Sequence, residues 1–403
     1  MRVEPNACRH RVAKCFNYIN FGCGLGPLQA RCARNWHSLC VATFSTMRIA
    51  IISTPFVPVP PHKYGGTELI VYELVEGLVA QGHDVTLYAT GDSRVSAKLR
   101  HLYPKAVWPP NAFNELNHVS WAMSEILADG DFDAIHTHSA LALPYTRMFP
   151  DLPMVYTMHH ARDPEFSEFY ANFATSMFIA ISANQKRQEI PLKHCEVIHH
   201  GLNANNFLWS PTAQDYVCFL GRFARIKGPD TAIDVAEKAG LRIKVAGEAH
   251  SCDREYVEKE VLPRLKRPHV EYMGCLGLKG KRPLLQHARA LLAPIAWEEP
   301  FGLFMIEAML SGCPVVAFRR GSVPEIVDQG VTGFIVDDFD QMVEIIRPGG
   351  VLDAFDRRQC REHAVTRFNR DRLIASHERL YSKIVRSNQA RDVIVLPELL
   401  QRA

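Results

Sequence analysis

Short runs of apolar and β-branched residues alternate along the chain with stretches in which apolar residues recur every three or four positions. The runs predict buried strands, and the periodic stretches predict helices. A first series of expected strands covers residues 48–53, 84–89, 133–138, 154–159, 177–182 and 196–200. A second series covers residues 216–220, 242–246, 270–273, 290–295, 314–318 and 333–336.

This alternation is typical of parallel sheets with helices on both faces. Thr67 is the expected N-cap of a first helix that runs through Ala80 and ends at Gly82. We expect the α/β class, with two Rossmann-like, doubly wound domains facing across a cleft. The expected parts are 47–205 (N-terminal domain), 206–214 (linker), 215–365 (C-terminal domain), 366–390 (a helix packing back toward the N-terminal domain) and 391–403 (tail). From 353 to about 385 the pattern of residues predicts helix.

Composition supports two globular domains. Of 403 residues, 47% are hydrophobic and 22% charged, which excludes disordered, collagen-like and coiled-coil chains. Single cores stop growing at about 250–300 residues. The net charge of +3 is too small to indicate nucleic-acid binding, and we find no apolar run of membrane-spanning length. We expect a cytoplasmic protein, at most peripheral at a membrane, and interpret the basic stretch 98–105 as a solvated helix face rather than a lipid contact.

Residues 1–46 differ from the rest. They hold six basic residues and one acid, whereas the remainder holds 40 basic and 42 acidic residues. Their five cysteines form no CxxC pair, and their glycines, with Pro27 in the place of a third glycine, make no dinucleotide loop. We expect a disordered extension, with a transit peptide as the alternative. The six later cysteines are scattered singly, which suits a reducing cytoplasm.

The stretch WEEPFGLFMIEAMLSGCPVV, at 297–316, is the most informative. Pro300 suits the first turn of a helix and Gly312 its end, so Glu299 would lie at the mouth and Glu307 about 12 Å further along the axis. Such a helix N-terminus offers free N–H groups to a phosphate, which Gly302 would allow to approach.

Two more glycine-containing loops follow expected strands. In FLGRFARIKG, Arg222 and Lys227 come after strand 216–220, where they can neutralise a diphosphate. In KYGGTE, Gly65 and Gly66 precede the first helix. Their spacing is not GxGxxG, which argues against a nicotinamide cofactor.

Four histidines lie at strand ends. His136 and His138 alternate along one strand and point to the same face, and His159 and His160 follow another. Neither a carboxylate nor a cysteine completes an obvious ligand set, so we expect no metal site.

The segment EPFGLFMIE is similar to the E-x7-E signature of family 4 of the retaining glycosyltransferases, which have the GT-B fold. The likeness runs over nearly all of residues 47–390 and includes the pattern G-R-x5-KG. By resemblance, Glu299 would contact donor-sugar hydroxyls, His159 would face the transferred sugar and Glu307 would bind the ribose. The implied catalytic residues are Glu299, His159, Arg222 and Lys227; the implied donor-binding residues are Glu307, Gly302, Leu303, Phe304, Gly65 and Gly66; and His138 is a candidate for the acceptor side.

Other loops also match the family. The resemblance places the GSVPE loop (321–325) beside the donor, the TGF loop (332–334) at a strand end and the nucleobase near residues 272–281. The family's NGvD reads HGLN at 200–203, which leaves the role of this hinge-side loop open.

The resemblance implies transfer of a hexose from a UDP- or GDP-sugar to an acceptor, with retention of configuration and without a metal or other cofactor. No side chain stands out as a double-displacement nucleophile, and the resemblance implies a front-face route in which the leaving phosphate helps to deprotonate the acceptor. The alternatives are an epimerase-like GT-B enzyme, a dinucleotide-dependent oxidoreductase and an inactive nucleotide-sugar-binding protein. The sugar, the base, the acceptor and the oligomeric state stay open.

Overall fold

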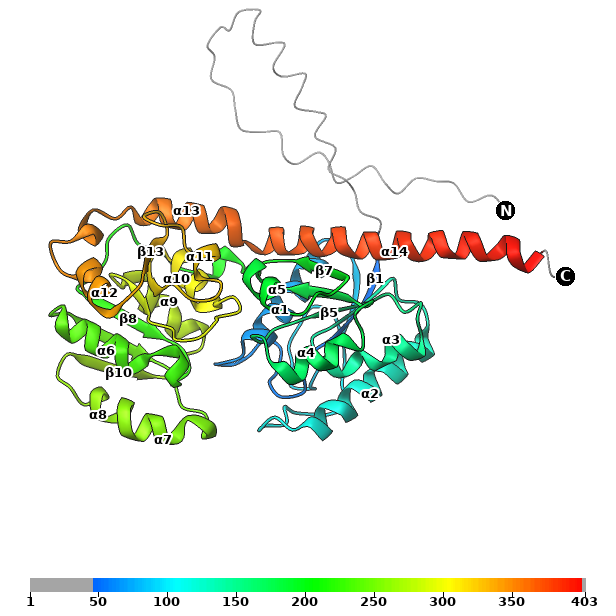
Figure 1. The fold of residues 1–403 in the computed structure, drawn as a ribbon, viewed down its shortest axis with the longest axis horizontal. Coiled ribbons are helices and arrows are strands. Elements are labelled where there is room, and N and C mark those ends of the chain that lie inside the picture. The colour runs from blue at the N-terminus through cyan, green and yellow to red at the C-terminus, as the bar shows by residue number, and fades with distance from the viewer. Residues whose placement is uncertain (1–45, 401–403) are drawn as a thin grey trace, which may run out of the picture. The chain divides into compact units, whose positions relative to one another are not determined.

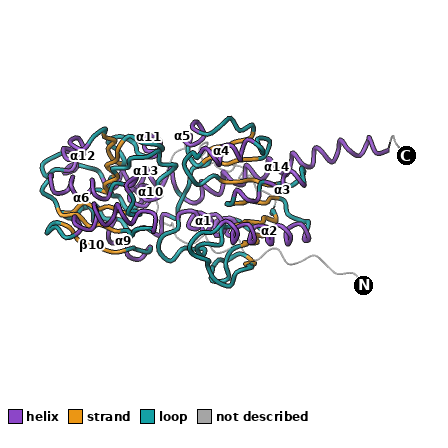
Figure 2. The backbone as a smooth tube through the Cα atoms, turned by 60° about the horizontal axis from the view of Figure 1, so that its bottom comes forward, coloured by secondary structure: helices purple, strands orange, loops and turns teal. Residues whose placement is uncertain are grey.

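The computed structural model describes residues 46–400, and their side chains as far as Arg386. The expected N-terminal extension, apart from Thr46, therefore lies outside the described residues. In the described part, the strands form two parallel sheets, ordered β3-β2-β1-β4-β5-β6-β7 and β10-β9-β8-β11-β12-β13. Each order reverses beside the sheet's first strand, which is the doubly wound arrangement that the sequence predicts. Helices flank the strands of both sheets (Figures 1 and 2).

The strands agree with the expected series to within a few residues. The first sheet contains β1 (Arg48–Ile52), β2 (Asp84–Tyr88), β3 (Lys98–Arg100), β4 (Ala134–Thr137), β5 (Met154–Thr157), β6 (Met177–Ala180) and β7 (His194–Val197). The second contains β8 (Tyr216–Leu220), β9 (Arg242–Ala246), β10 (Val270–Gly274), β11 (Leu291–Ala293), β12 (Val315–Phe318) and β13 (Gly333–Val336). The expected linker, 206–214, lies within the connection from β7 to β8.

Helices fill the connections. The α-helices are α1 (Gly66–Ala80), α2 (Ala112–Asp129), α3 (Pro144–Met148), α4 (Pro164–Ala171), α5 (Ala183–Gln188), α6 (Pro229–Lys238), α7 (Arg254–Tyr256), α8 (Leu262–Leu265), α9 (Leu278–His287), α10 (Leu303–Leu310), α11 (Val323–Ile326), α12 (Phe339–Ile346), α13 (Arg357–Phe368) and α14 (Arg370–Leu400). Shorter 3-10 or π turns are η2 (Ala140–Ala142), η3 (Ala204–Asn206), η4 (Arg225–Lys227), η5 (Ser251–Asp253), η6 (Val257–Val261) and η7 (Val351–Ala354).

The first strand shows why the sheets are buried on both faces. Ile49 and Ile51 are fully buried in the core cluster that includes residues of α1 and α14, whereas Ala50 and Ile52 are fully buried in the cluster that includes α2. Alternate side chains of a strand point to opposite faces, so both faces of this sheet are covered. Full burial of each isoleucine stabilises the fold by about 1.5–3 kcal/mol.

Two connections cross where the chain passes between the sheets. The N–H of Leu202 donates to the carbonyl of Phe368 at 2.9 Å, and the N–H of Arg370 donates to the carbonyl of Leu202 at 3.0 Å. Gly201 allows this approach, since a Cβ there would lie 2.2 Å from the carbonyl oxygen of Asn369. The expected continuous helix is therefore wrong at Asn369, where these strand-like contacts separate α13 from α14.

The last helix packs on the first sheet. Leu373, Ile374, Leu380 and Tyr381 of α14 belong to the core cluster of α1 and β1, and Figure 1 shows α14 running beside these elements. The helix continues to Leu400, so the tail expected from 391 is wrong as far as that residue. The extension to 396 contains no glycine or proline that would end a helix.

Two other local predictions are wrong. The basic stretch 98–105 is not a helix: it begins with strand β3, which pairs with β2 at the sheet edge. Lys98 and Arg100 of this strand are exposed and only Leu99 is half-buried, so its sequence looks like the solvated face of a helix. The N-cap of α1 is Gly65 rather than Thr67. Thr67 already lies inside the first turn.

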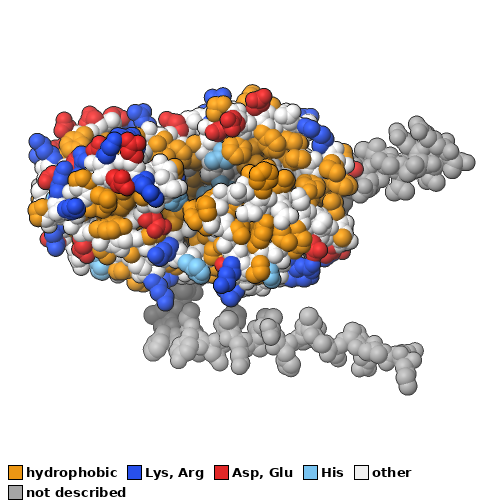
Figure 3. All heavy atoms as spheres, turned by 90° about the horizontal axis from the view of Figure 1, so that it is seen from below, with side chains coloured by type: hydrophobic (Ala, Val, Ile, Leu, Met, Phe, Trp, Pro, Cys, Tyr) orange, Lys and Arg blue, Asp and Glu red, His pale blue; other side chains and the backbone are white. Residues whose placement is uncertain are grey.

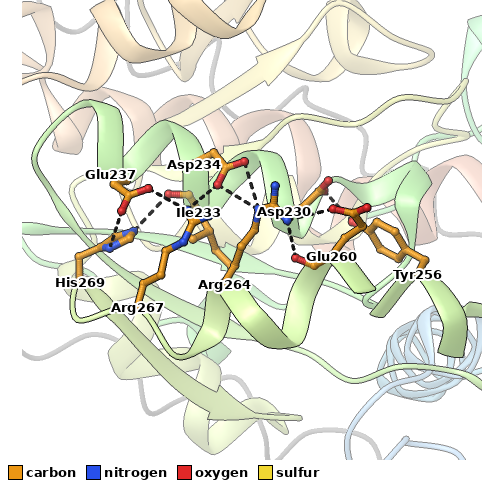
Figure 4. A network of polar contacts seen from close by, with 9 residues as sticks. All are labelled: Asp230, Ile233, Asp234, Glu237, Tyr256, Glu260, Arg264, Arg267 and His269. Carbon is orange, nitrogen blue, oxygen red and sulfur yellow. Dashed lines mark hydrogen bonds and ion pairs between the residues drawn. The ribbon is translucent and has the colours of Figure 1, made fainter. Parts of the chain in front are cut away.

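A polar network stabilises the outer surface of the second sheet's half (Figure 4). Asp234 of α6 accepts hydrogen bonds from Nε of Arg264 at 3.0 Å and from Nη1 of Arg267 at 2.6 Å. The hydroxyl of Tyr256 donates to Asp230 at 2.6 Å. These bonds attach the segment from α7 to α8 to α6, and connected charges stabilise more than isolated surface pairs.

Candidate active site

A cavity of about 730 Å³ lies between the loops at the carboxyl ends of the two sheets. Its walls include the loops after β1, β3, β5, β6 and β7 in the first sheet and after β8, β9, β10 and β11 in the second. This is the position at which doubly wound sheets bind ligands, and the volume suits a ligand of nucleotide-sugar size. Figure 3 shows a recess on the face seen from below, with histidine side chains in it.

The structure brings nearly all the expected site residues to this cavity. The residues that line it are Glu299, His159, Arg222, Lys227, Glu307, Gly302, Leu303, Phe304, Gly65 and Gly66. His138 does not line it: the side chain is buried behind His159, so the expected acceptor-side contact is wrong.

The first glutamate of the E-x7-E motif lies before the helix, not on it. Helix α10 begins at Leu303, with Gly302 as its N-cap at φ 84°, a conformation that favours glycine. Pro300 is therefore in the preceding loop, and the expected helical spacing of Glu299 and Glu307 is wrong. The loop is held by Gly321, where a Cβ would lie 2.2 Å from the backbone nitrogen of Glu299.

Each motif glutamate is buried and pairs with a lysine. Glu299 is 5% exposed and accepts from Nζ of Lys227 and from Nε1 of Trp297, the latter at 3.0 Å. Glu307 is 2% exposed and accepts from Nζ of Lys281 at 3.0 and 3.1 Å. Buried charges without partners are costly, so each lysine offsets the cost of burying its glutamate in the cavity wall.

Lys281 was missed as a site residue because the resemblance placed the nucleobase near 272–281 without assigning a role to any side chain there. Cys275, Leu276, Leu278 and Lys281 of this segment line the cavity, whereas Tyr272 does not. The signal that could have found Lys281 is its position in the first turn of the helix that faces α10.

Arg222 adds a third cation. Its Nε lies 3.4 Å from Oδ2 of Asp253, and its side chain is 25% exposed. Lys227 also lies 4.8 Å from the ring centroid of Trp297, within cation–π range. The guanidinium and the two ammonium groups therefore face one ligand space.

Two helix N-termini meet at the same cavity. The N-caps of α1 and α10 are Gly65 and Gly302, which have no side chains to satisfy the first N–H groups. The two ends approach closely: a Cβ on Gly66 would lie 3.5 Å from Cδ1 of Leu303. Uncapped helix N-termini attract anions through free N–H groups and the helix dipole.

Two aromatic side chains of the first half border the mouth of the cavity. Tyr64 and Trp108 line it, are 49% and 58% exposed, and contact the ring of His250 of the second half edge-on at 5.5 and 5.7 Å. Sequence reasoning missed Tyr64 because only the two glycines of KYGGTE were considered, and missed Trp108 because its loop carries no motif.

Histidines form part of the wall. His159 and His200 line the cavity, and burial lowers the pKa of His159 to about 3 and that of His200 well below its usual value. The HGLN loop therefore contributes His200, which the sequence left without a role.

The GSVPE and TGF loops do not line the cavity. Glu325 instead accepts from the backbone N–H groups of Ala183 and Asn184 at 2.8–3.2 Å and pairs with His199, linking the two halves. The expectation that GSVPE borders the donor is therefore wrong for its side chains, although Gly321 supports the Glu299 loop. Gly333 packs against the backbone of Val315 inside the second sheet.

Two further searches cover the described residues only. Among the side chains that the structure describes, 46–386, no group of three or more His, Cys, Asp and Glu is arranged to hold a metal ion. Among the helices of residues 46–400, none combines the length and the apolar character needed to cross a membrane.

Two doubly wound halves face one cavity that carries an E-x7-E loop and three cations, which is the arrangement of the GT-B fold. Two family models match adjacent parts of the chain: Glycosyltransferase Family 4 over residues 64–206 and Glycosyl transferases group 1 over residues 206–347. The chain therefore belongs to the family 4 glycosyltransferases, as the motif resemblance predicts.

Relatives and solved structures agree with this membership. Spore coat protein SA of Bacillus subtilis is 22% identical over 84% of this chain and 100% of its own length. D-inositol 3-phosphate glycosyltransferase of Mycolicibacterium paratuberculosis is 26% identical over 62% of this chain and 67% of its own. The structure of sucrose-phosphate synthase of Thermosynechococcus elongatus matches with a TM-score of 0.72 and 20% identity; the match covers 85% of this chain and 100% of that one. The structure of Anabaena Alr3699/HepE, solved with UDP and glucose, matches with a TM-score of 0.65 and 20% identity; this match covers 83% of this chain and 99% of that one. The expected GT-B fold is confirmed.

Proposed function

We propose that this protein transfers a hexose from a nucleoside diphosphate sugar to an acceptor hydroxyl, with retention of anomeric configuration. The observation that carries the proposal is the convergence of two uncapped helix N-termini and the cations Arg222, Lys227 and Lys281 on one cavity. A diphosphate is the ligand that this combination of N–H groups and cations matches best.

The cations would stabilise the charge that grows on the leaving diphosphate. Arg222 offers a planar fork of donors, and Lys227 can move between Glu299 and a phosphate oxygen because its stem is flexible. In an enclosed site such preorganised charges lower the barrier without a metal ion. Glu299 would then orient hydroxyls of the hexose, and Glu307 would accept from the ribose hydroxyls.

The state of the carboxylates supports a front-face route. The glutamates that line the cavity are all engaged with neighbours: Glu68 with Thr54, Glu73 with Arg370, Glu248 with Cys275, Glu299 with Lys227 and Glu307 with Lys281. A carboxylate that is paired with a lysine, or a carboxyl whose pKa is raised by burial as that of Glu73 is, is a weaker nucleophile toward the anomeric carbon than a free carboxylate. We therefore assign deprotonation of the acceptor to the leaving phosphate oxygen, which stays on the face that the acceptor attacks.

The test is a binding screen followed by analysis of the product. The full chain is titrated with UDP, GDP and ADP and with their glucose conjugates, and NAD is the control. UDP-glucose is tried first, because Anabaena Alr3699/HepE, a structure with this fold, was solved with UDP and glucose. Ligand at about 100 times its dissociation constant should stabilise the fold by about 2.7 kcal/mol. Proton NMR of the glycoside formed should show the donor's anomeric configuration. Binding of NAD alone, or an inverted product, would contradict the proposal.

A further inference from the structure

Five histidine rings, four of them buried and that of His159 half-buried, form a row through the first half. From α14 to the cavity, the order is His377, His136, His138, His159 and His200, with ring centroids 5.3, 4.4, 5.1 and 5.6 Å apart. Only the last two line the cavity. The row therefore connects the last helix of the chain to the wall of the active site.

A hydrogen bond joins two members of the row directly. Nδ1 of His138 lies 2.8 Å from Nε2 of His159. Burial, together with the neighbouring histidines, lowers the pKa of both rings, so both are neutral near pH 7. A neutral imidazole carries one N–H donor and one acceptor nitrogen, so one ring must donate this bond and the other must accept it.

The surroundings of His138 indicate which ring donates. Its Nε2 is buried and has no hydrogen-bond partner among the described residues. Buried N–H groups without an acceptor are rarer in folded proteins than acceptors without a donor. The proton of His138 is therefore on Nδ1, and His138 donates to His159.

This direction fixes the proton on His159. Since Nε2 of His159 accepts, its single proton lies on Nδ1, for which the described residues offer no partner. The ring lines the cavity, so this N–H is available to a ligand. We propose that His138 is a positioning residue: it holds His159 in the tautomer that presents Nδ1–H to an oxygen of the bound sugar.

The rest of the row keeps His138 and His159 in place. The ring of His136 is stacked on His138 and is itself held at both nitrogens, by the hydroxyl of Tyr381 at 2.6 Å and the hydroxyl of Thr157 at 2.7 Å. On the other side, His200 stacks on His159 at an interplanar angle of 21°. Tyr381 of helix α14 therefore holds His136, which in turn packs against His138 behind the cavity wall.

Nitrogen-15 NMR of histidine-labelled full-length protein tests the tautomer directly. Correlation through two bonds distinguishes protonated from unprotonated ring nitrogens, and the His159 signals are assigned by their loss in His159→Gln. We expect a protonated Nδ1 and an unprotonated Nε2 on His159 in the free protein. A protonated Nε2 on His159 would overturn the proposal.

A pair of variants separates positioning from packing. Asparagine at 138 places its amide near the position of Nδ1 and can still donate to His159, whereas glutamine places its amide nearer that of Nε2. We expect His138→Asn to retain the His159 tautomer and His138→Gln to give a mixture. His118→Gln, a change at another buried neutral histidine outside the cavity, is the control and should leave the His159 signals unchanged. Identical His159 spectra in both His138 variants would overturn the proposal.

The sugar contact rests on the proposed function, so it has a separate readout. With UDP-glucose as the probe, His138→Gln should release UDP with a kcat about tenfold lower than His138→Asn, while KM differs little, because one positioned hydrogen bond is lost in the transition state. Equal kcat values despite different tautomers would remove the catalytic part of the inference. Absence of turnover in the wild type would count against the proposed donor and would leave the NMR result as the test of positioning.

Discussion

The Nζ of Lys281 lies 3.0 Å from Oε1 of Glu307, although the two residues come from different helices, α9 and α10. The carboxylate that the resemblance assigns to the ribose is therefore oriented before a ligand binds. A preoriented carboxylate accepts from two adjacent hydroxyls without first losing its own freedom.

The first prediction concerns that carboxylate. Glu307→Gln should raise the dissociation constant for UDP about tenfold or more, because hydrogen bonds to a charged group contribute about 1.5–3 kcal/mol. Isothermal titration calorimetry measures it. Wild-type protein should bind 2′-deoxy-UDP more weakly than UDP, and the variant should discriminate less between the two. Glu258→Gln, at an exposed position outside the cavity, is the matched control. Equal affinities of the variant and the wild type would remove Glu307 from the ribose site.

The second prediction concerns the leaving group. Arg222→Ala should lower kcat about 100-fold, which corresponds to about 2.7 kcal/mol, and change KM much less, because the guanidinium meets most charge in the transition state. Steady-state release of the nucleoside diphosphate measures both constants. Arg254→Ala, at an exposed position of α7 that does not line the cavity, is the control. A change confined to KM would show that Arg222 only binds the ground state.

These assignments show which parts of the site the sequence contains. The strands and the E-x7-E, GR and GG loops are local patterns, so the sequence predicts both the sheets and the residues that meet at their carboxyl ends. The alternation of His136 and His138 places them on one face, but the pairing of Lys281 with Glu307 and the rest of the histidine row depend on how distant segments pack. Glu299 was placed on a helix because Pro300 commonly starts one, but the left-handed Gly302 delays the helix to Leu303.

The third prediction concerns the polar network of Figure 4. Asp234→Ala leaves Arg264 and Arg267 without their shared carboxylate, and we expect it to lower the free energy of unfolding by about 1 kcal/mol. The loss should shrink in about 1 M salt, because these side chains are partly exposed and salt screens them. Chemical denaturation at low and high salt measures it. Glu344→Ala removes an isolated exposed pair with Arg347 and should cost much less. A loss of equal size in both variants would argue against a network.

The last prediction concerns a buried carboxyl beside the crossing connections. Glu73 of α1 is 2% exposed, and Nη1 of Arg370 lies 3.5 Å from its Oε2. Burial raises the pKa of Glu73 to about 7 from 4.5, because loss of water outweighs the attraction of Arg370.

The direction of the pH effect follows from this raised pKa. Between about pH 4.5 and pH 7, folded protein keeps a proton on Glu73 that unfolded chains have lost, so stability falls as pH rises through this window and is level above it. The full loss is up to about 3 kcal/mol, at 1.36 kcal/mol for each pKa unit. The glutamine of the Glu73→Gln variant cannot ionise, so this variant should not lose stability over that pH range. The variant's thermal midpoint should therefore match that of the wild type near pH 5 and exceed it near pH 8, whereas Glu258→Gln should follow the wild type at both. If Glu73→Gln were instead less stable than the wild type at pH 8, the carboxylate would be ionised in the folded protein, and its pair with Arg370 would outweigh the cost of burial.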